Sequence, residues 1–202
     1  HVPHEVGVGR ELGPPRRGDL TQELDGVVAD LVPAGAVDPG EEVLRLGVPR
    51  PPQVGGDGRQ RLLAEAGIAT AVVEFEQPTR TSAEAAAAIG CTVAEIAKSV
   101  VFRAKPSGQA VVVVASGDNR VCEDKVSRLV GERLGRANAD FVREATGYVI
   151  GGVSPLGHAN PVKVVLDADL RRFTTIWAAA GTPFSVFPLA PEQLVAITGA
   201  TW

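Results

Sequence analysis

Apolar residues recur with the spacing of short strands and helices over the last three quarters of the chain. The run QAVVVVA at residues 109–115 is continuously apolar, which is typical of a strand buried on both faces. Other apolar runs bounded by turn residues predict further strands. The predicted strands are residues 70–75, 99–103, 109–115, 134–137, 147–150, 162–167, 174–179 and 185–188.

Capping residues mark where helices begin and end. Thr81 or Ser82 begins a helix that Gly90 ends, and Asn138 caps another. The predicted helices are residues 59–66, 82–90, 123–130, 139–145 and 191–198, with a helical turn at 93–97. Strands and helices are intermixed and several strands are joined by short turns. This order predicts a mixed α/β fold, with a mixed, partly barrel-like sheet and surrounding helices, rather than a doubly wound parallel sheet.

Residues 1–53 have a different composition from the rest. They hold eight Pro and eight Gly and no aromatic residue, Ile, Lys, Ser, Asn or Cys. Such a segment cannot bury enough apolar surface to offset its ordering entropy. One prediction is a disordered tail that forms at most a short helix at residues 20–31. The other is that this segment is a non-native extension, encoded by a reading frame that runs upstream of the natural start. The folded domain is predicted to span residues 54–202.

The charge of the chain is divided in the same way. Residues 1–53 hold five Arg and nine Asp or Glu, whereas residues 54–202 hold fifteen basic and fifteen acidic residues. The acidic excess therefore lies outside the predicted domain, which could carry a local basic face for RNA. No apolar run is long enough to span a bilayer, and there is no signal pattern. The two cysteines, Cys91 and Cys122, fit no disulfide framework, so we expect a cytoplasmic protein.

The most distinctive polar segment is the glycine loop GGVSPLG, which begins at Gly151-Gly152. Paired glycines allow close backbone approach and positive φ, and backbone N–H groups in such a turn can hold a carbonyl or an oxyanion. The pattern is neither a dinucleotide fingerprint nor a phosphate-binding loop. Taken alone, it favours a structural turn between strands.

Two other features are candidates for chemistry. Lys98 lies at the entrance of an apolar strand, where its ammonium could bind a phosphate or simply reach solvent. The SGDNR turn at residues 116–120 follows the most apolar strand, and loops at strand ends are frequent ligand sites. An ordinary turn explains this segment equally well.

Other reactive residues give weaker signals. His158 is the only histidine beyond residue 53, so a metal site is not expected. A triad with Ser116 or Ser154 is formally possible, but no GxSxG motif supports it. Cys122 is better explained as a helix-start residue than as a nucleophile. Trp177 and Phe184 are predicted to lie in the core.

The order and spacing of these segments together are specific. KSVVF, VVVVASGDNRV, REATGYVIGGVSPLGHANPVKVVLD and TTIWAAAGTPFSVFPLAPEQLVAITGA follow one another along residues 98–200. This series resembles the YbaK/EbsC family, the free-standing relatives of the editing domain of bacterial prolyl-tRNA synthetases. The resemblance covers about residues 59–202 and does not extend to residues 1–53.

The resemblance implies an enzyme that hydrolyses the ester of mischarged tRNA, chiefly tRNA for proline carrying alanine, cysteine or another small amino acid. It implies Lys98 as the functional lysine and Gly151 or Gly152 as the start of the GxxxP loop. No metal or cofactor is implied. The implied partner is the acceptor end of mischarged tRNA, and prolyl-tRNA synthetase is a second partner left open, as is the oligomeric state. The expected substrate-binding residues are Ser116, Gly117, Asp118, Asn119, Thr146, Gly147, Tyr148, Ser154, Pro155, Gly157 and His158.

Three alternatives remain open at this point. The first is a module of the same fold that binds tRNA or a synthetase without catalysis. The second is an unrelated hydrolase with Ser116, Ser154 or Cys122 as its nucleophile. The third, a fragment of a whole prolyl-tRNA synthetase, is disfavoured because the flanks hold no synthetase catalytic motif.

Overall fold

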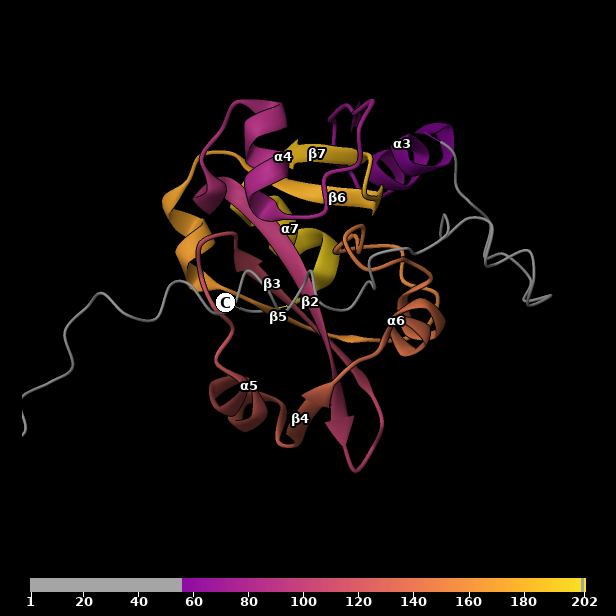
Figure 1. Ribbon diagram of the computed structural model, residues 1–202, viewed down its shortest axis with the longest axis vertical. Helices are drawn as coiled ribbons and strands as arrows, with labels where there is room; N and C mark the ends of the chain where they lie inside the picture. The colour runs from indigo at the N-terminus through magenta and orange to yellow at the C-terminus, as the bar shows by residue number, and fades with distance from the viewer. Residues whose placement is uncertain (1–55, 201) are drawn as a thin grey trace, which may run out of the picture. The chain divides into compact units, whose positions relative to one another are not determined.

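A seven-stranded mixed sheet is the framework of the part of the chain that the structure describes (Figure 1). The computed structural model describes residues 56–200 and 202, and they fall in one compact unit. The expectations for residues 1–53 lie outside the described residues. The strands are β1 (Val73–Glu74), β2 (Ile96–Lys105), β3 (Ala110–Ser116), β4 (Arg133–Arg136), β5 (Lys163–Leu166), β6 (Ile176–Thr182) and β7 (Ser185–Leu189).

The sheet is open, with the strand order β1-β7-β6-β2-β3-β5, and β4 pairs with β2 off this path. β2 runs parallel to β6, β3 runs parallel to β5, and the other pairs are antiparallel. The helices are α3 (Gly56–Glu65), α4 (Ser82–Ile89), α5 (Glu123–Val130), α6 (Ala139–Thr146) and α7 (Pro191–Thr198), with 3₁₀ turns η1 (Val93–Glu95) and η2 (Ala168–Arg172). The predicted mixed α/β fold is confirmed, and the sheet does not close into a barrel.

Local capping chemistry sets the helix ends as the sequence predicts. The Thr81 hydroxyl accepts the Glu84 N–H at 3.2 Å, and the Glu84 carboxylate accepts the Thr81 N–H at 3.0 Å. Gly90 then ends α4 in the left-handed conformation, with φ of 81°. The Asn138 side chain accepts the Phe141 N–H at the start of α6. These caps satisfy backbone groups that short helices otherwise leave unpaired.

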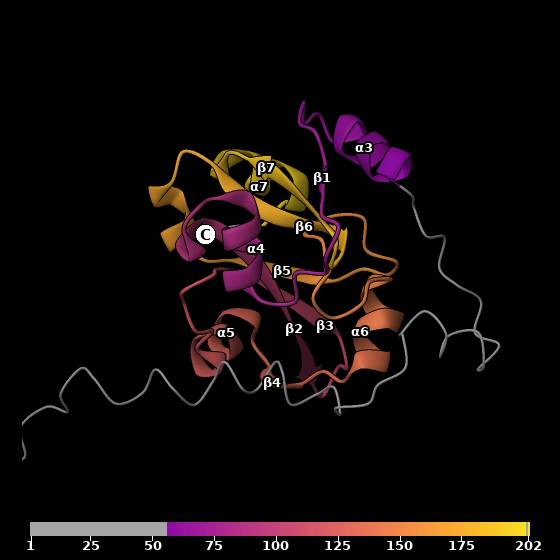
Figure 2. The same ribbon diagram turned by 45° about the horizontal axis from the view of Figure 1, so that its top comes forward.

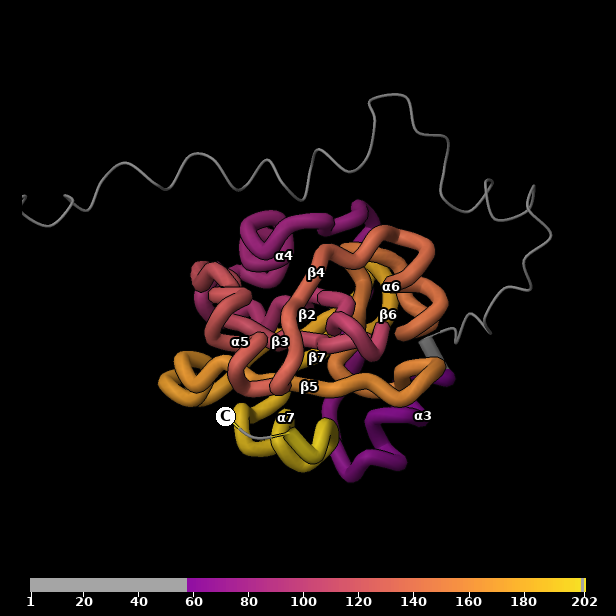
Figure 3. The backbone as a smooth tube through the Cα atoms, turned by 90° about the horizontal axis from the view of Figure 1, so that it is seen from below, coloured from indigo at the N-terminus to yellow at the C-terminus, as the bar shows by residue number. Residues whose placement is uncertain are grey.

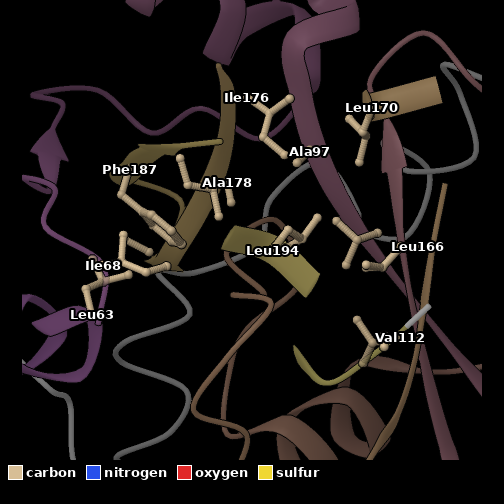
Figure 4. Packing of buried hydrophobic residues seen from close by; sticks show 14 residues of the cluster. Leu63, Ile68, Ala97, Val112, Leu166, Leu170, Ile176, Ala178, Phe187 and Leu194 are labelled. Carbon is tan, nitrogen blue, oxygen red and sulfur yellow. The ribbon is translucent and has the colours of Figure 1, made fainter. Parts of the chain in front are cut away.

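The two faces of the sheet are covered by different helices. Ala97, Val112 and Ala178 belong to one buried cluster that also takes in residues of α3, η2 and α7 (Figure 4). The opposite face packs against α5 through Phe102 and Val126, and against α4 through a separate cluster. α4 and α7 accordingly lie on opposite sides of β6 and β7 (Figures 2 and 3).

Two sequence predictions are wrong. Residues 147–150 do not form a strand, because Gly147 ends α6 with φ of 78° and the Tyr148 N–H turns back to the Thr146 hydroxyl. Phe184 is 44% exposed in the β6–β7 turn, so it does not lie in the core. Trp177 does pack against the cluster under α4. None of the helices in the described part of the chain is long and apolar enough to cross a membrane.

Leu194 of α7 is fully buried in the large cluster, so it tests the packing of this face. We expect Leu194→Ala to lower the free energy of unfolding by about 2–5 kcal/mol, because it leaves a cavity. The matched control is Leu129→Ala on α5, whose side chain is 63% exposed. That change should stay within about 0.5 kcal/mol. Denaturant unfolding measures both, and equal losses would contradict the assigned core.

Candidate active site

Lys98 lies where β2 passes the end of β3. The antiparallel register pairs Lys98 with Ala115, so the turn that follows Ser116 comes beside the lysine. The Lys98 ammonium donates to the Gly117 carbonyl oxygen at 2.9 Å, and this contact is partly buried. Lys98 and the turn at residues 116–120, which the sequence presents as separate candidates, therefore lie side by side.

The turn after β3 is held rigidly. The buried Ser116 hydroxyl lies 2.6 Å from the Ala94 carbonyl oxygen and 2.8 Å from Asp118 Oδ1, and it donates its proton within this pair of acceptors. A side chain at Gly117 would collide with the Val93 carbonyl oxygen. Ser116 therefore anchors the turn, and no histidine is among its hydrogen-bond partners in the described residues, as a triad would require.

Asp167 is a site residue that the sequence analysis missed. Its carboxylate accepts the Ser116 N–H at 3.1 Å and the Asn119 side-chain amide at 2.8 Å. It also caps η2 by accepting the Asp169 N–H. An aspartate directly after a strand and before a helical turn is a capping signal that could have been noticed. Asp118 faces the other way and contacts Arg172 at 3.4 Å.

The glycine loop packs closely against the end of β6. Gly151 has φ of 87°, and Gly152 leaves so little room that an added Cβ would lie 2.6 Å from the Thr182 carbonyl carbon. The Gly152 N–H already donates to the Val149 carbonyl oxygen at 3.0 Å. Among the described residues, the N–H groups of Gly151, Val153 and Ser154 make no hydrogen bond. Val153 and Ser154 are nevertheless buried, so these amides are candidate donors to a bound ligand.

Other predicted residues fix the conformation of the glycine loop through contacts with its carbonyl oxygens. The Tyr148 hydroxyl donates to the Leu156 carbonyl oxygen at 2.8 Å, and the absence of a Cβ at Gly157 leaves room for that hydroxyl. His158 Nε2 lies 2.9 Å from the Ser154 carbonyl oxygen, which can only accept, so Nε2 carries the proton. Its ring meets Tyr148 edge to face.

Burial favours the neutral forms of the Tyr148 and His158 side chains, which contact the glycine loop. It raises the pKa of Tyr148 and lowers the pKa of His158, although the hydrogen bond to Ser154 opposes the second shift. Thr146 is fully buried, and its hydroxyl donates to Val142. Pro155 is also fully buried. These groups act as supports, and none of them has the geometry of a nucleophile and base pair.

The N-terminus of α4 joins the two halves of the site. A Cβ on Gly117 would lie 3.1 Å from Ser82, and one on Gly151 would lie 3.9 Å from the Arg80 backbone. The segment that enters α4 passes beside the loop after α6 in both Figure 1 and Figure 2. Lys98 and the glycine loop thus flank the start of one helix. We take this arrangement as the candidate active site.

Neither cysteine side chain hydrogen-bonds to a residue of this arrangement in the described part of the chain. Cys122 is the exposed N-cap residue of α5, and burial raises the pKa of the Cys91 thiol. The described residues hold no group of three or more His, Cys, Asp or Glu side chains that could bind a metal ion. A small cavity under the loop is lined by Tyr148, Ser154 and Leu156 together with residues of α3.

Comparison with known proteins identifies the family of the chain. Residues 76–197, which include the whole candidate site, match the family model described as the aminoacyl-tRNA editing domain. The chain is 37% identical over 123 residues to the uncharacterized protein YwhH of Bacillus subtilis strain 168, covering 61% of this chain and 78% of that one. It is 27% identical over 119 residues to EbsC of Enterococcus faecalis strain ATCC 700802 / V583, covering 58% and 72%. EbsC is named as a proposed deacylase of Cys-tRNA(Pro) and Cys-tRNA(Cys).

Solved structures agree with this assignment. The crystal structure of a protein proposed as a trans-editing enzyme for prolyl-tRNA synthetase matches with a TM-score of 0.67 and 43% identity, covering 73% of this chain and 94% of that one. The hypothetical protein APE2540 matches with a TM-score of 0.66 and 30% identity, covering 70% and 94%. The chain therefore belongs to the aminoacyl-tRNA editing-domain family of the YbaK/EbsC type, a family of trans-editing aminoacyl-tRNA deacylases.

Proposed function

We propose that residues 54–202 form a deacylase domain that hydrolyses tRNA for proline carrying a small non-cognate amino acid, such as alanine or cysteine. The observation that carries this proposal is the contact between Lys98 and Gly117, which fixes an ammonium beside the helix start that the glycine loop also approaches. The relatives named for prolyl-tRNA editing and for cysteinyl-tRNA support the choice of substrate.

Lys98 is proposed to bind the terminal adenosine or its phosphate. An ammonium at the mouth of a partly buried site attracts an anion more strongly than one in open water. The Gly117 carbonyl holds the Lys98 ammonium in place, and the network from Asp167 through Ser116 fixes that carbonyl. Lys98 thereby positions the ester without taking part in bond making.

The backbone of the glycine loop is proposed to hold the aminoacyl carbonyl. The N–H groups of Gly151, Val153 and Ser154 can serve here, whereas the N–H of Gly152 is engaged with Val149. Gly152 contributes instead by letting the loop lie against Thr182. Each well-aimed donor to a developing oxyanion is worth about 3–4 kcal/mol.

Hydrolysis needs no nucleophile from the protein in this arrangement. Water attacks the acyl carbon, the bond to the ribose oxygen breaks, and that oxygen leaves with a proton from the water. A substrate hydroxyl or thiol can assist, and no metal ion is required. Because an aminoacyl ester is already reactive, positioning supplies the acceleration. Substrates that differ by one methylene are separated by only about 1–3 kcal/mol, so several small amino acids are accepted.

A panel of charged tRNAs tests this function directly. We expect the full chain to deacylate alanyl- and cysteinyl-tRNA for proline in the presence of EDTA, while prolyl-tRNA for proline is spared. Release of the labelled amino acid measures the rate. Binding of these tRNAs without any release above the uncatalysed rate would show a binding module instead. Loss of activity in EDTA would contradict the metal-free mechanism.

Lys98→Met tests the role of the ammonium, because it keeps the apolar stem and removes the charge. Hydrogen bonds to charged groups are worth about 1.5–3 kcal/mol, so we expect kcat/KM for the mischarged tRNA to fall about 10- to 150-fold. The matched control is Lys125→Met on α5, an exposed lysine, which should leave kcat/KM unchanged. Equal rates for wild type and Lys98→Met would remove Lys98 from the site.

Gly152→Ala tests the close packing of the loop. The added Cβ meets the Thr182 backbone, so the loop must shift, and a shift of about 1 Å can cost about 100-fold in rate. Gly199→Ala is the control for backbone strain alone, because Gly199 has positive φ, which Gly152 does not, and has open space around it. We expect both variants to lose about 1–2 kcal/mol of stability from strain, with deacylation lost only in Gly152→Ala. Retained activity in Gly152→Ala would contradict the proposed cradle.

A further inference from the structure

We propose that the far half of β2 and its partner β4 form the surface that docks the acceptor stem of tRNA. This basic ribbon is defined by Arg103 and Lys105 of β2 and by Arg133 of β4, which the register places on one face, whereas Arg136 lies opposite Phe102 on the other face. The inference rests on the proposed function, since it names where the body of the same substrate binds. It adds a contact surface outside the candidate active site.

Charge is sorted unevenly over the sheet. Strands β2, β3, β4 and β5 contain six basic residues and no aspartate or glutamate. The six are Lys98, Arg103, Lys105, Arg133, Arg136 and Lys163. Residues 54–202 as a whole carry equal numbers of acidic and basic residues. The acidic residues that balance the cations of these four strands therefore lie in other parts of residues 54–202.

The cations of the basic ribbon lack ion-pair partners in the described part of the chain. The two salt bridges found there, Arg61–Glu65 and Asp118–Arg172, lie elsewhere. The carboxylate of Glu132, which precedes β4, accepts the Ser107 N–H at 2.9 Å, and this hydrogen bond lowers the pKa of Glu132. That carboxylate is engaged in the β2–β3 turn.

Other acidic residues on the helices that pack near the ribbon are Glu123 and Asp124 on α5 and Asp140 and Glu144 on α6, and all four are exposed. None of them makes a salt bridge with a ribbon cation in the described residues. The positive charge of the ribbon is therefore not compensated by close pairing within the fold. A polyanion such as the phosphate backbone of RNA supplies the negative charge that the basic ribbon lacks.

The register of the ribbon places like charges together. Lys105 lies directly opposite Arg133, a pairing that destabilises a sheet when nothing neutralises it. Gly135 lies opposite Arg103, and an added Cβ on Gly135 would come within 2.9 Å of Lys105 Cε. The absence of a side chain at Gly135 thus leaves space for the Lys105 stem. Arg103 is held over the Phe141 ring at 5.1 Å.

The basic ribbon lies within reach of the candidate active site. Arg103 follows Lys98 by five residues on one strand, a distance of about 17 Å. About five stacked nucleotides cover that distance at about 3.4 Å each. α6 makes a second connection, because Phe141 contacts Arg103 and Gly147 at the end of the helix leads into the glycine loop. A tRNA end bound at Lys98 therefore lies about one strand length from the ribbon, and its stem meets Arg103 on the opposite face of β2.

Salt-dependent binding of uncharged tRNA tests the surface without using catalysis. The triple variant Arg103→Gln, Lys105→Gln, Arg133→Gln removes three cations. Each lost phosphate contact lowers the slope of log K against log salt by about 0.9 on a duplex. We expect the slope to fall by about 2–3 and Kd to rise at least about tenfold, as measured by fluorescence anisotropy. The matched control is Arg61→Gln, Lys125→Gln, Arg171→Gln, with the same residue types and charge change, which should change neither value.

Deacylation assays separate this inference from the proposed function. In the ribbon variant we expect KM for mischarged tRNA to rise about tenfold, while kcat/KM for an aminoacyl ester of a short, stemless oligonucleotide stays within about twofold. Loss of activity on the short ester would show a defect in the site or the fold, and it would overturn the inference. An unchanged Kd for tRNA and an unchanged salt slope in the ribbon variant would also overturn the inference. That holds even if the variant lost binding to prolyl-tRNA synthetase, because the ribbon would then be a protein-binding surface.

Two further outcomes are informative. A wild type that deacylates nothing but binds tRNA through the ribbon would refute the proposed function alone. If the triple variant fails to fold by circular dichroism, the single change Arg133→Gln takes its place, with an expected slope decrease of about 0.9. An unchanged slope in a folded Arg133→Gln protein would remove Arg133 from the surface.

Discussion

The antiparallel register of β2 and β3 is the constraint on which the candidate site depends. It pairs Lys98 with Ala115 and so brings the Gly117 carbonyl to the lysine ammonium. Because side chains alternate along a strand, a slip of one residue would turn Lys98 into the opposite face. The buried side chains of β3 resist such a slip, since all seven of its residues are buried between β2 and β5.

The polar groups of the site serve mainly to hold backbone in place. Asp167 holds the turn through Ser116 and Asn119, and His158 and Tyr148 hold the carbonyl side of the glycine loop. The groups proposed to contact the substrate are the Lys98 ammonium and the amide N–H groups of the glycine loop. A site with these groups can orient and polarise an ester, which agrees with a deacylase family whose substrate is reactive without further activation.

Sequence reasoning succeeded where the signal was local. The predicted bounds of α5 and α7 match the structure, Pro191 and Gly199 mark the ends of α7, and the apolar run predicts β3 within one residue. It failed where a tertiary neighbour decides the outcome. The segment 147–150 has strand-like residues but turns back on α6, and Phe184 is apolar but lies in a turn where no helix covers it. The pairing of β4 with β2, and the Val149 acceptor that engages the Gly152 N–H, likewise depend on contacts that no local pattern contains.

β2 connects the candidate active site with the proposed docking ribbon, and side-chain alternation along it constrains how one ligand could reach both. Lys98 and Arg103 are an odd number of residues apart, so their side chains leave the strand on opposite faces. On the edge of β2 away from β3, β6 pairs only with Ile96 and Ala97, and β4 begins at Phe102. Residues 98–101 have no strand partner on that edge in the described chain. The strand pairing on that edge is thus interrupted between the lysine and the basic ribbon, and the buried Ser99 hydroxyl there has no hydrogen-bond partner among the described residues. An RNA that contacts both Lys98 and Arg103 therefore has to reach both faces of the sheet, so the proposed acceptor-stem contact and the proposed ester contact lie on different sides of β2.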